Sequence, residues 1–258
     1  MTTPASLLDV DVTGGVATLT LSDPGRRNAL TGPLVDEMVA AVDRVEAPDS
    51  GVAAIVVTGA APAFCAGADL SDLGRSRASR EAGLRSIYEG FLRIARSPLV
   101  TIAAVNGAAV GAGMNLALGC DVRIAARRAK FDTRFLQLGL HPGGGHTWML
   151  QRIVGPQAAA AMLLLGEVLD GEAAERAGLV WRCVDDDALI EVATALGRKA
   201  AAGPPELVRR IKGTLADMWS IGDHGAAVDR ELETQLWSLD QPDFAERLAA
   251  LQKKITSR

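Results

Sequence analysis

The stretch "VNGAAVGAGMNLALGCDV", Val105 to Val122, decides how we interpret this chain of 258 residues. Small residues, two of them glycines, run from Val110 to Gly113 and open an apolar segment with the character of a helix. Glycine lets the backbone approach another group closely, and the first amide groups of a helix have no partner within it. The stretch therefore predicts a binding surface made of backbone N–H groups, with the polar Asn115 inside the first helical turn.

The segments around this stretch predict buried, parallel strands. The runs 52–60 and 99–107 are apolar on both faces, which is typical of strands covered by helices on each side, and 120–126 follows as a third strand. The connections between them are long enough for parallel pairing. Nearer the start, residues 7–24 alternate apolar and polar side chains across a Gly-Gly turn, the pattern of a hairpin. We therefore predict an α/β fold.

The end of the chain has a different pattern. From about Gly155 onward, the apolar residues recur at helical spacing, and no low-complexity linker separates this part from the strands. We predict that residues 1–200 form the core with the sheet, and that residues 201–258 form a helical C-terminal region.

Composition excludes several classes of protein. Hydrophobic residues make up 48% and charged residues 22% of the chain, which favours a folded globular protein. A net charge of −4 argues against a nucleic-acid surface, which needs a dense basic face. The three cysteines are scattered without metal-ligand spacing, so neither a zinc site nor a disulfide framework is expected. With no signal-peptide pattern and no membrane span, we expect a cytoplasmic protein.

Two strand-to-helix corners share the same small residues. "FCAGADL" (64–70) and "VGAGMNL" (110–116) could each direct one backbone N–H group at the same oxygen atom. Such an oxyanion hole stabilises negative charge that develops on a carbonyl oxygen, and a helix N-terminus adds its partial positive charge. The alternative is that small residues only let helix and strand pack closely.

Several separate motifs, in order, resemble the crotonase superfamily, which contains the enoyl-CoA hydratases and isomerases. They are the opening stretch, "FCAGADL", "DPGRRNALTGPLVDEM" (23–38), "LGLHPGGGHTWMLQRIVG" (138–155) and "GEVLDGEAAERAGLV" (166–180). The resemblance implies a crotonase (ClpP-like) spiral of β-β-α units. It also implies a helical C-terminal region that mediates homotrimers, often paired into hexamers.

The resemblance further implies an acyl-CoA thioester as substrate or ligand, with no separate cofactor. The oxyanion-hole donors fall on the backbone N–H groups of Ala68 and Ala112. The residues implied to contact the CoA thioester are Arg26, Arg27, Ala66, Ala68, Asp69 and Leu70. Among them, the carbonyl of Ala66 is expected to meet the adenine amino group, and the two arginines are expected near the CoA phosphates. For these arginines a solvated loop is the alternative.

Two positions depart from the family pattern. Hydratases of the family have a glutamate at the position of Asn115 and another at the position of Phe135, and together these carboxylates hold water and move the proton at the α-carbon. An asparagine can hydrogen-bond water but cannot accept a proton at neutral pH, and a phenylalanine can do neither. The chain is thus nominally an enoyl-CoA hydratase/isomerase of fatty-acid metabolism that lacks both usual catalytic glutamates.

A histidine could replace the lost acid–base groups. His141 lies in the loop that family members run past the acyl pocket, and histidine titrates near neutral pH. The alternative for His141 is a loop residue bonded to a backbone carbonyl. His146, at the start of a predicted helix, is expected to have a packing or capping role.

Two functions remain open on the sequence. One is an enzyme that keeps the oxyanion hole and recruits His141, or a carboxylate not yet placed, for a reaction on the thioester. The other is a non-catalytic acyl-CoA carrier or sensor, because Phe135 would fill the space that a water and a carboxylate need.

Overall fold

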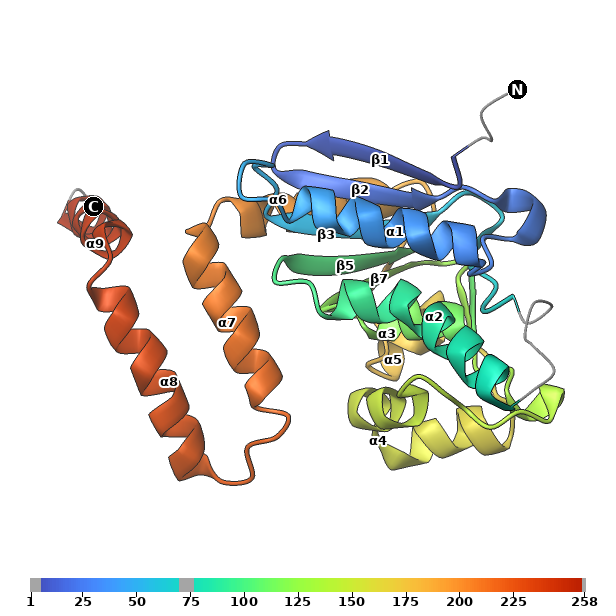
Figure 1. Ribbon diagram of the computed structural model, residues 1–258. Helices are drawn as coiled ribbons and strands as arrows, with labels where there is room; N and C mark the ends of the chain where they lie inside the picture. Colours follow the sequence, from blue (N-terminus) through green and yellow to red (C-terminus); the bar gives the residue numbers. More distant parts are fainter. Residues whose placement is uncertain (1–5, 70–76, 257–258) are drawn as a thin grey trace. The chain divides into compact units, whose positions relative to one another are not determined.

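The structure, a computed structural model, describes residues 6–69 and 77–256, so the predicted contact of Leu70 lies outside the described residues. The chain forms two compact units, Met1–Ala201 and Ala202–Arg258. The first unit contains both sheets and the second consists of helices (Figure 1).

A six-stranded sheet has the order β1-β2-β3-β5-β7-β10. Its strands are β1 (Leu8–Thr13), β2 (Val16–Leu21), β3 (Ala54–Gly59), β5 (Val100–Val105), β7 (Val122–Ala126) and β10 (Arg182–Val184). The pair β1–β2 is antiparallel, and every other neighbouring pair is parallel. The predicted hairpin and the predicted parallel pairing are both confirmed.

A second, smaller sheet has the order β4-β6-β8-β9. Its strands are β4 (Ala63–Cys65), β6 (Ala108–Val110), β8 (Lys130–Asp132) and β9 (Leu169–Asp170). In the pairs β3/β4, β5/β6 and β7/β8, the first strand joins the large sheet and the next strand joins the small one. A helix follows each of the first two pairs, so the chain advances in β-β-α units.

Helices cover both faces of the large sheet. The helices of this unit are α1 (Gly32–Val45), α2 (Arg77–Ala95), α3 (Ala112–Leu118), α4 (His146–Leu164), α5 (Gly171–Arg176) and α6 (Leu189–Ala201). Side chains of β3 alternate between two cores: Ile55 and Val57 pack in the core of α1, α2 and α3, whereas Ala54 and Val56 pack with residues of α6. This alternation explains why the strand is apolar throughout.

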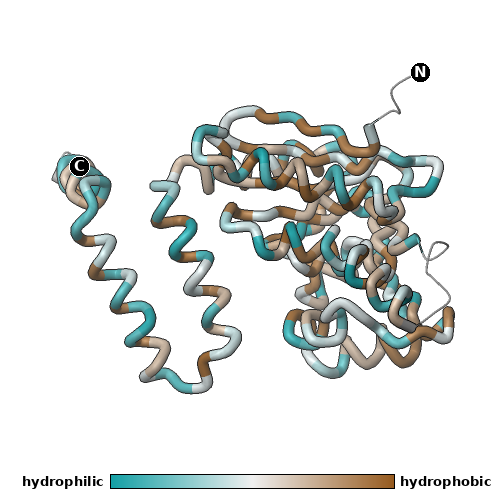
Figure 2. The backbone as a smooth tube through the Cα atoms, in the orientation of Figure 1, coloured by the Kyte–Doolittle hydropathy of each residue, from teal (hydrophilic) through white to brown (hydrophobic). Residues whose placement is uncertain are grey.

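The second unit contains α7 (Pro205–Asp217), α8 (His224–Leu239) and α9 (Pro242–Thr256). Apolar and polar residues alternate along these helices (Figure 2), and neither α7 nor α8 has a buried residue. Among the described residues, no helix combines the length and the apolar character that crossing a membrane requires.

Candidate active site

The two strand-to-helix corners touch each other. A Cβ on Gly67 would lie 2.8 Å from the carbonyl oxygen of Val110 and 3.7 Å from the amide nitrogen of Ala112. Gly67 also has a φ of +105°, a conformation that glycine adopts without strain. The glycine of the first corner therefore lets the second corner approach closely, as the pattern of small residues predicted.

Each corner presents one backbone N–H group. Gly67 O accepts a hydrogen bond from Leu30 N, and Asp69 N donates to Leu30 O, so the amide of Ala68 between them points away from Leu30. Ala112 is the first residue of α3, where an amide has no helical partner. Within the described part of the chain, neither amide donates a backbone hydrogen bond.

A pocket of about 310 Å³ lies at these corners. Its lining comes from the two corners, from α2 and from the segment after β8. The lining residues are Ala66, Gly67, Ala68, Leu84, Ile87, Tyr88, Val110, Gly111, Ala112, Asn115, Thr133, Arg134, Phe135, Leu138, Leu140, His141 and Gly143. The described lining thus brings together most of the predicted site residues and includes neither an aspartate nor a glutamate.

Asn115 is buried in the pocket wall with both ends of its amide engaged. Its Nδ2 donates to the carbonyl oxygen of Gly143 at 3.0 Å, and its Oδ1 lies 2.6 Å from Nδ1 of His146. The ring of Phe135 lines the pocket and meets the His146 ring edge-on, with ring centroids 4.9 Å apart. The predicted pair of positions is therefore close in space, and a histidine joins it.

Burial keeps His146 uncharged. Its side chain is 1% exposed, and desolvation lowers its pKa from 6.5 to about 4. Its Nε2 has no hydrogen-bond partner among the described residues. His146 is also the first residue of α4, so the expected place at the start of a helix is confirmed.

His141 is an exposed residue of the pocket lining. Its Nδ1 lies 2.7 Å from the carbonyl oxygen of Pro142, which is the backbone contact that the structural alternative predicted. Because a carbonyl oxygen only accepts hydrogen bonds, Nδ1 carries a proton. In the neutral imidazole, Nε2 is then the nitrogen with the lone pair.

The ion pair of Asp132 with Arg134 flanks Phe135. Nε of Arg134 donates to the Asp132 carboxylate at 2.9 Å, and a second guanidinium nitrogen bonds the same oxygen. Hydrogen bonding to this carboxylate raises the pKa of Arg134, so the arginine stays charged. Arg134 lines the pocket, whereas Asp132 does not.

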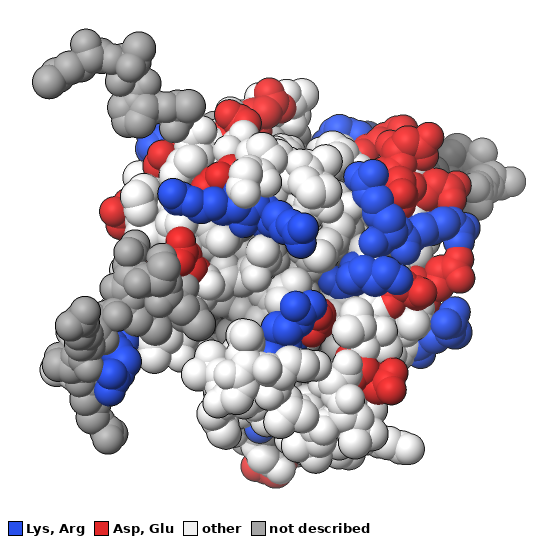
Figure 3. Space-filling model, turned by 90° about the vertical axis from the view of Figure 1, so that its right-hand side faces the viewer, with Lys and Arg blue, Asp and Glu red and all other residues white. Residues whose placement is uncertain are grey.

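The predicted CoA-contacting residues lie at and beside the first corner. The amide of Ala66 donates to the carbonyl oxygen of Arg27 at 3.0 Å, so the arginine loop lies against this corner. Arg26 and Arg27 are exposed, and Asp69 is half-buried; none of the three lines the pocket. Basic and acidic side chains are interspersed on the face of the molecule in Figure 3.

Two residues of this region were not predicted to have their roles. His146 packs as expected, against Phe135, but its bond to Asn115 was not predicted. Asn28 is fully buried with a φ of +59°, and its Nδ2 donates to the carbonyl oxygens of Ala60 and Ala63 at 2.8 Å each. A buried amide needs hydrogen-bond partners. The position of Asn115 in an apolar helix therefore indicated, from the sequence alone, that a polar group lies next to it.

Comparison with known proteins agrees with this geometry. The family model for enoyl-CoA hydratase/isomerase matches residues 11–247. The chain belongs to the enoyl-CoA hydratase/isomerase family. Its relatives within this family include a "Probable enoyl-CoA hydratase" of Mycobacterium tuberculosis, which is 50% identical over 254 residues and covers 96% of this chain and 97% of its own.

Other members of the enoyl-CoA hydratase/isomerase family differ in the reaction they are named for. A 1,2-epoxyphenylacetyl-CoA isomerase of Escherichia coli is 40% identical over 195 residues, 74% of each chain. A crystal structure of an enoyl-CoA hydratase from Bacillus anthracis matches with a TM-score of 0.90 and 28% identity, and covers 96% of both chains. The predicted crotonase fold is thus confirmed.

Proposed function

We propose that the protein binds acyl-CoA thioesters in the pocket and acts on them as an enzyme. The thioester oxygen accepts hydrogen bonds from the amides of Ala68 and Ala112. One observation carries this proposal: two amides that donate no backbone hydrogen bond to any described residue, one from each of two touching corners, belong to residues that line one pocket. Such preorganised donors favour a state in which negative charge develops on the bound oxygen.

The CoA portion lies along the first corner in this proposal. The carbonyl of Ala66 accepts from the adenine amino group, and Arg26 and Arg27 meet the phosphates. The hydrogen bond from Ala66 N to Arg27 O supports this arrangement, because it places the arginine loop beside the corner. Among the described residues, Asp23 is the ion-pair partner of Arg26, at the long distance of 3.9 Å, and the arginine side chain is 62% exposed, so its guanidinium can reach a phosphate.

The reaction we propose is isomerisation through a thioester enolate, with His141 as the proton acceptor. Hydration by the family's usual route needs carboxylates where this chain has Asn115 and Phe135. In a 3-enoyl thioester, His141 takes a proton from the α-carbon, and the negative charge that develops on the thioester oxygen is stabilised by the two amides. The protonated His141 then gives the proton to the γ-carbon, so that the thioester carbonyl re-forms and the double bond moves to the α- and β-carbons. His141 lines the pocket, its Nδ1 is engaged by a backbone carbonyl, and its Nε2 has no hydrogen-bond partner among the described residues; histidine is the side chain that most often transfers protons near neutral pH.

Three substrates test this function. Crotonyl-CoA and a longer 2-enoyl-CoA are mixed with the protein, loss of the enoyl absorbance is followed, and binding is titrated by calorimetry. A 3-enoyl-CoA is assayed for appearance of that absorbance. We expect binding of all three, little hydration, and isomerisation of the 3-enoyl substrate.

The outcomes separate the parts of the proposal. Rapid hydration would show that proton transfer does not depend on carboxylates at positions 115 and 135. If none of these thioesters binds, the acyl-CoA assignment is overturned. His141→Ala should slow isomerisation at least about a hundredfold if it removes the general base. His224→Ala, at the first residue of α8 in the other unit, is the matched control and should leave the rate unchanged.

The second candidate is a non-catalytic acyl-CoA carrier or sensor. It is favoured by the engagement of both ends of the Asn115 amide and by the apolar ring of Phe135, which leave neither position able to transfer a proton. Tight binding without turnover of any of the three thioesters would support it. The double variant Asn115→Glu/Phe135→Glu should then gain hydratase activity if the pocket still positions the substrate.

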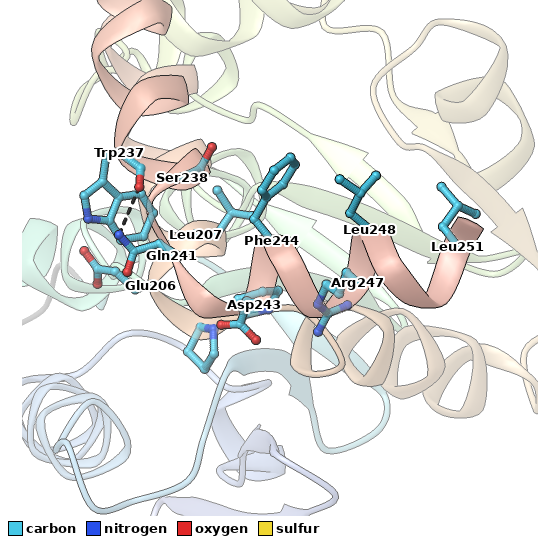
Figure 4. Close-up of a pocket in the computed structure, with 12 residues that line it drawn as sticks. Glu206, Leu207, Trp237, Ser238, Gln241, Asp243, Phe244, Arg247, Leu248 and Leu251 are labelled. Carbon is cyan, nitrogen blue, oxygen red and sulfur yellow. Dashed lines mark hydrogen bonds between the residues drawn. The ribbon is translucent and has the colours of Figure 1, made fainter. Parts of the chain in front are cut away.

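A homotrimer, alone or paired into a hexamer, is the assembly we propose. The helices of the C-terminal unit present large apolar side chains to solvent, and a groove of about 540 Å³ lies among them. Phe244, Leu248 and Leu251 line this groove from one side of α9 (Figure 4), and Leu251 is 55% exposed. Contiguous exposed apolar surface of this kind favours burial against another subunit. Light scattering of Leu251→Glu beside the unchanged protein tests this, with dissociation expected.

A further inference from the structure

Asn115 connects three segments of the pocket region. It belongs to α3, its Nδ2 bonds the carbonyl oxygen of Gly143 in the loop before α4, and its Oδ1 bonds the first side chain of α4, His146. Asn115 and His146 are each 1% exposed. The same Gly143 oxygen also accepts from the backbone N–H of His146 at 3.3 Å, which closes a ring of contacts.

Chemistry fixes the protons in this ring. The carbonyl of Gly143 can only accept, so the amide nitrogen of Asn115 must face it and the amide oxygen must face His146. Nδ1 of His146 therefore carries its proton and donates to Asn115. Every member of the ring is uncharged, and each amide atom of Asn115 has a partner. The neutral amide of Asn115 therefore makes both hydrogen bonds without any change of protonation.

The segment held by this ring, Gly143–Gly145, has no side chains that could fix its conformation. Gly143, Gly144 and Gly145 follow one another, and the last two have φ values of +66° and +82°. Glycine loses more conformational freedom on ordering than any other residue. A Cβ on Gly143 would lie 2.3 Å from the Tyr88 hydroxyl, so the backbone itself forms the surface there. Gly143 lines the pocket, and a shift of the loop would change the pocket's shape.

We propose that Asn115 and His146 form an uncharged clamp that positions the Gly143–Gly145 loop as a wall of the acyl pocket. His146 is a positioning residue: it acts through Asn115 and does not itself line the pocket. Phe135 covers the imidazole from the pocket side of the pair, in edge-on contact. The clamp adds a positioning residue to the proposed function. Its expected effect on ligand affinity rests on that proposed function.

Two variants of equal shape test the clamp without a ligand. His146→Leu removes the donor, whereas His146→Asn keeps an N–H donor close to the position of Nδ1, and leucine and asparagine branch alike. Hydrogen exchange of the peptide covering residues 143–149 is measured by mass spectrometry. We expect at least tenfold faster exchange in His146→Leu, and exchange within threefold of the unchanged protein in His146→Asn. The peptide of β5 serves as the internal control and should not change.

Equal exchange in the two variants would overturn the clamp, whether both are slow or both are fast. If His146→Leu does not fold, His146→Gln takes its place, because its longer side chain moves the amide donor away from the Nδ1 position. The comparison with His146→Asn is then read in the same way.

Ligand affinity tests the positioning role. Calorimetry with crotonyl-CoA should give a Kd at least tenfold weaker for His146→Leu and within threefold for His146→Asn. Faster exchange without weaker binding would overturn positioning, since the loop would then move without consequence for the ligand. If the unchanged protein binds no acyl-CoA, the proposed function fails, whereas the exchange experiment still decides the clamp.

Discussion

Gly113 and Cys65 touch through their backbones: a Cβ on Gly113 would lie 2.2 Å from the carbonyl oxygen of Cys65. This contact sets α3 against β4 and so holds the two corners of the pocket together. Because backbone cannot rotate away as a side chain can, Gly113→Ala must displace α3. We expect a loss of about 1–3 kcal/mol in the free energy of unfolding, as for other overpacked sites, together with weaker acyl-CoA binding.

Gly213→Ala is the matched control for Gly113→Ala. Gly213 lies in α7, and a Cβ there would meet nothing within 4 Å. Alanine is the better helix former, so this variant should be more stable by roughly 0.5–1 kcal/mol. Urea unfolding gives both values, and calorimetry gives the affinities. A Gly113→Ala variant that binds and unfolds like the unchanged protein would show that the corners do not depend on this contact.

The oxyanion-hole assignment predicts a specific effect of Ala112→Pro. Proline has no N–H group but is well suited to the first position of a helix, which Ala112 occupies in α3. Gly111 before it has φ 51° and ψ −113°, outside the α region that a following proline disfavours. The variant should therefore fold, and isomerisation should fall by about 100–1000-fold, the usual effect of losing one oxyanion donor.

Ala112→Ser keeps the N–H group with a side chain of similar size, so its rate should stay within a few-fold of the unchanged protein. Circular dichroism and urea unfolding establish that both variants are folded before their rates are compared. If Ala112→Pro and Ala112→Ser turn over equally fast, the amide of residue 112 does not stabilise the reacting oxygen.

The buried His146 predicts a pH dependence of stability. Its pKa falls from 6.5 to about 4 on folding because burial disfavours the charged form. Well above pH 6.5 both states are neutral and the group has no effect. As pH falls from 6.5 toward 4, the unfolded chain takes up a proton that the folded chain does not, so stability decreases. The full loss, reached below pH 4, is about 3 kcal/mol.

His146→Leu isolates this contribution. Carboxylates titrate in both proteins, so the difference between the two pH profiles reports the histidine alone. Urea unfolding at pH 7.5 and pH 4.5 should show a smaller loss of stability in the variant, by about 2–3 kcal/mol. Parallel profiles would mean that the imidazole titrates in the folded protein as it does in the unfolded chain.

Local patterns were enough to predict five of the six strands of the large sheet and the corners, whereas β10 lies in the part of the chain that was expected to be helical. The hairpin of β1 and β2 follows from alternation across Gly14 and Gly15, which have φ values of +60° and +76°. The start of α3 at Ala112 follows from the small residues before it. These features depend on residues that are close in the sequence, so periodicity and turn chemistry are sufficient to predict them.

Such local patterns could not predict tertiary contacts. The run 99–107 was predicted as one strand, but the chain turns at Asn106 and Gly107 and continues as β6 in the other sheet. Strands of two or three residues are too short for a period to be read. The bond between Asn115 and His146 joins residues 31 positions apart, and only the folded chain brings them together.

Asn28 offers a further test, because its buried amide ties together the loop beside the first corner. Its Nδ2 donates to the carbonyl oxygens of Ala60 and Ala63, and its Oδ1 accepts from Asp23 N at 3.0 Å. Asn28→Asp replaces the donor with a buried charge facing carbonyl oxygens, at a cost on the order of 3–5 kcal/mol. Asn28→Gly loses the bonds of both Nδ2 and Oδ1, but it introduces no buried charge and adopts the φ of +59° without strain, so it should cost less.

The pH dependence of Asn28→Asp distinguishes charge from lost hydrogen bonds. Burial raises the pKa of a carboxyl group above its unfolded value, so the folded variant holds a proton more tightly than the unfolded chain. The loss in its free energy of unfolding, relative to the unchanged protein, should therefore be greatest at neutral pH. This loss should shrink as pH falls through the raised pKa, because the protonated carboxyl can donate to a carbonyl. Asn28→Gly has no such group, and its deficit should not shrink in this way. Urea unfolding of both variants between pH 7.5 and pH 5 measures this, and equal deficits across that range would show that the loop tolerates a charge at this position.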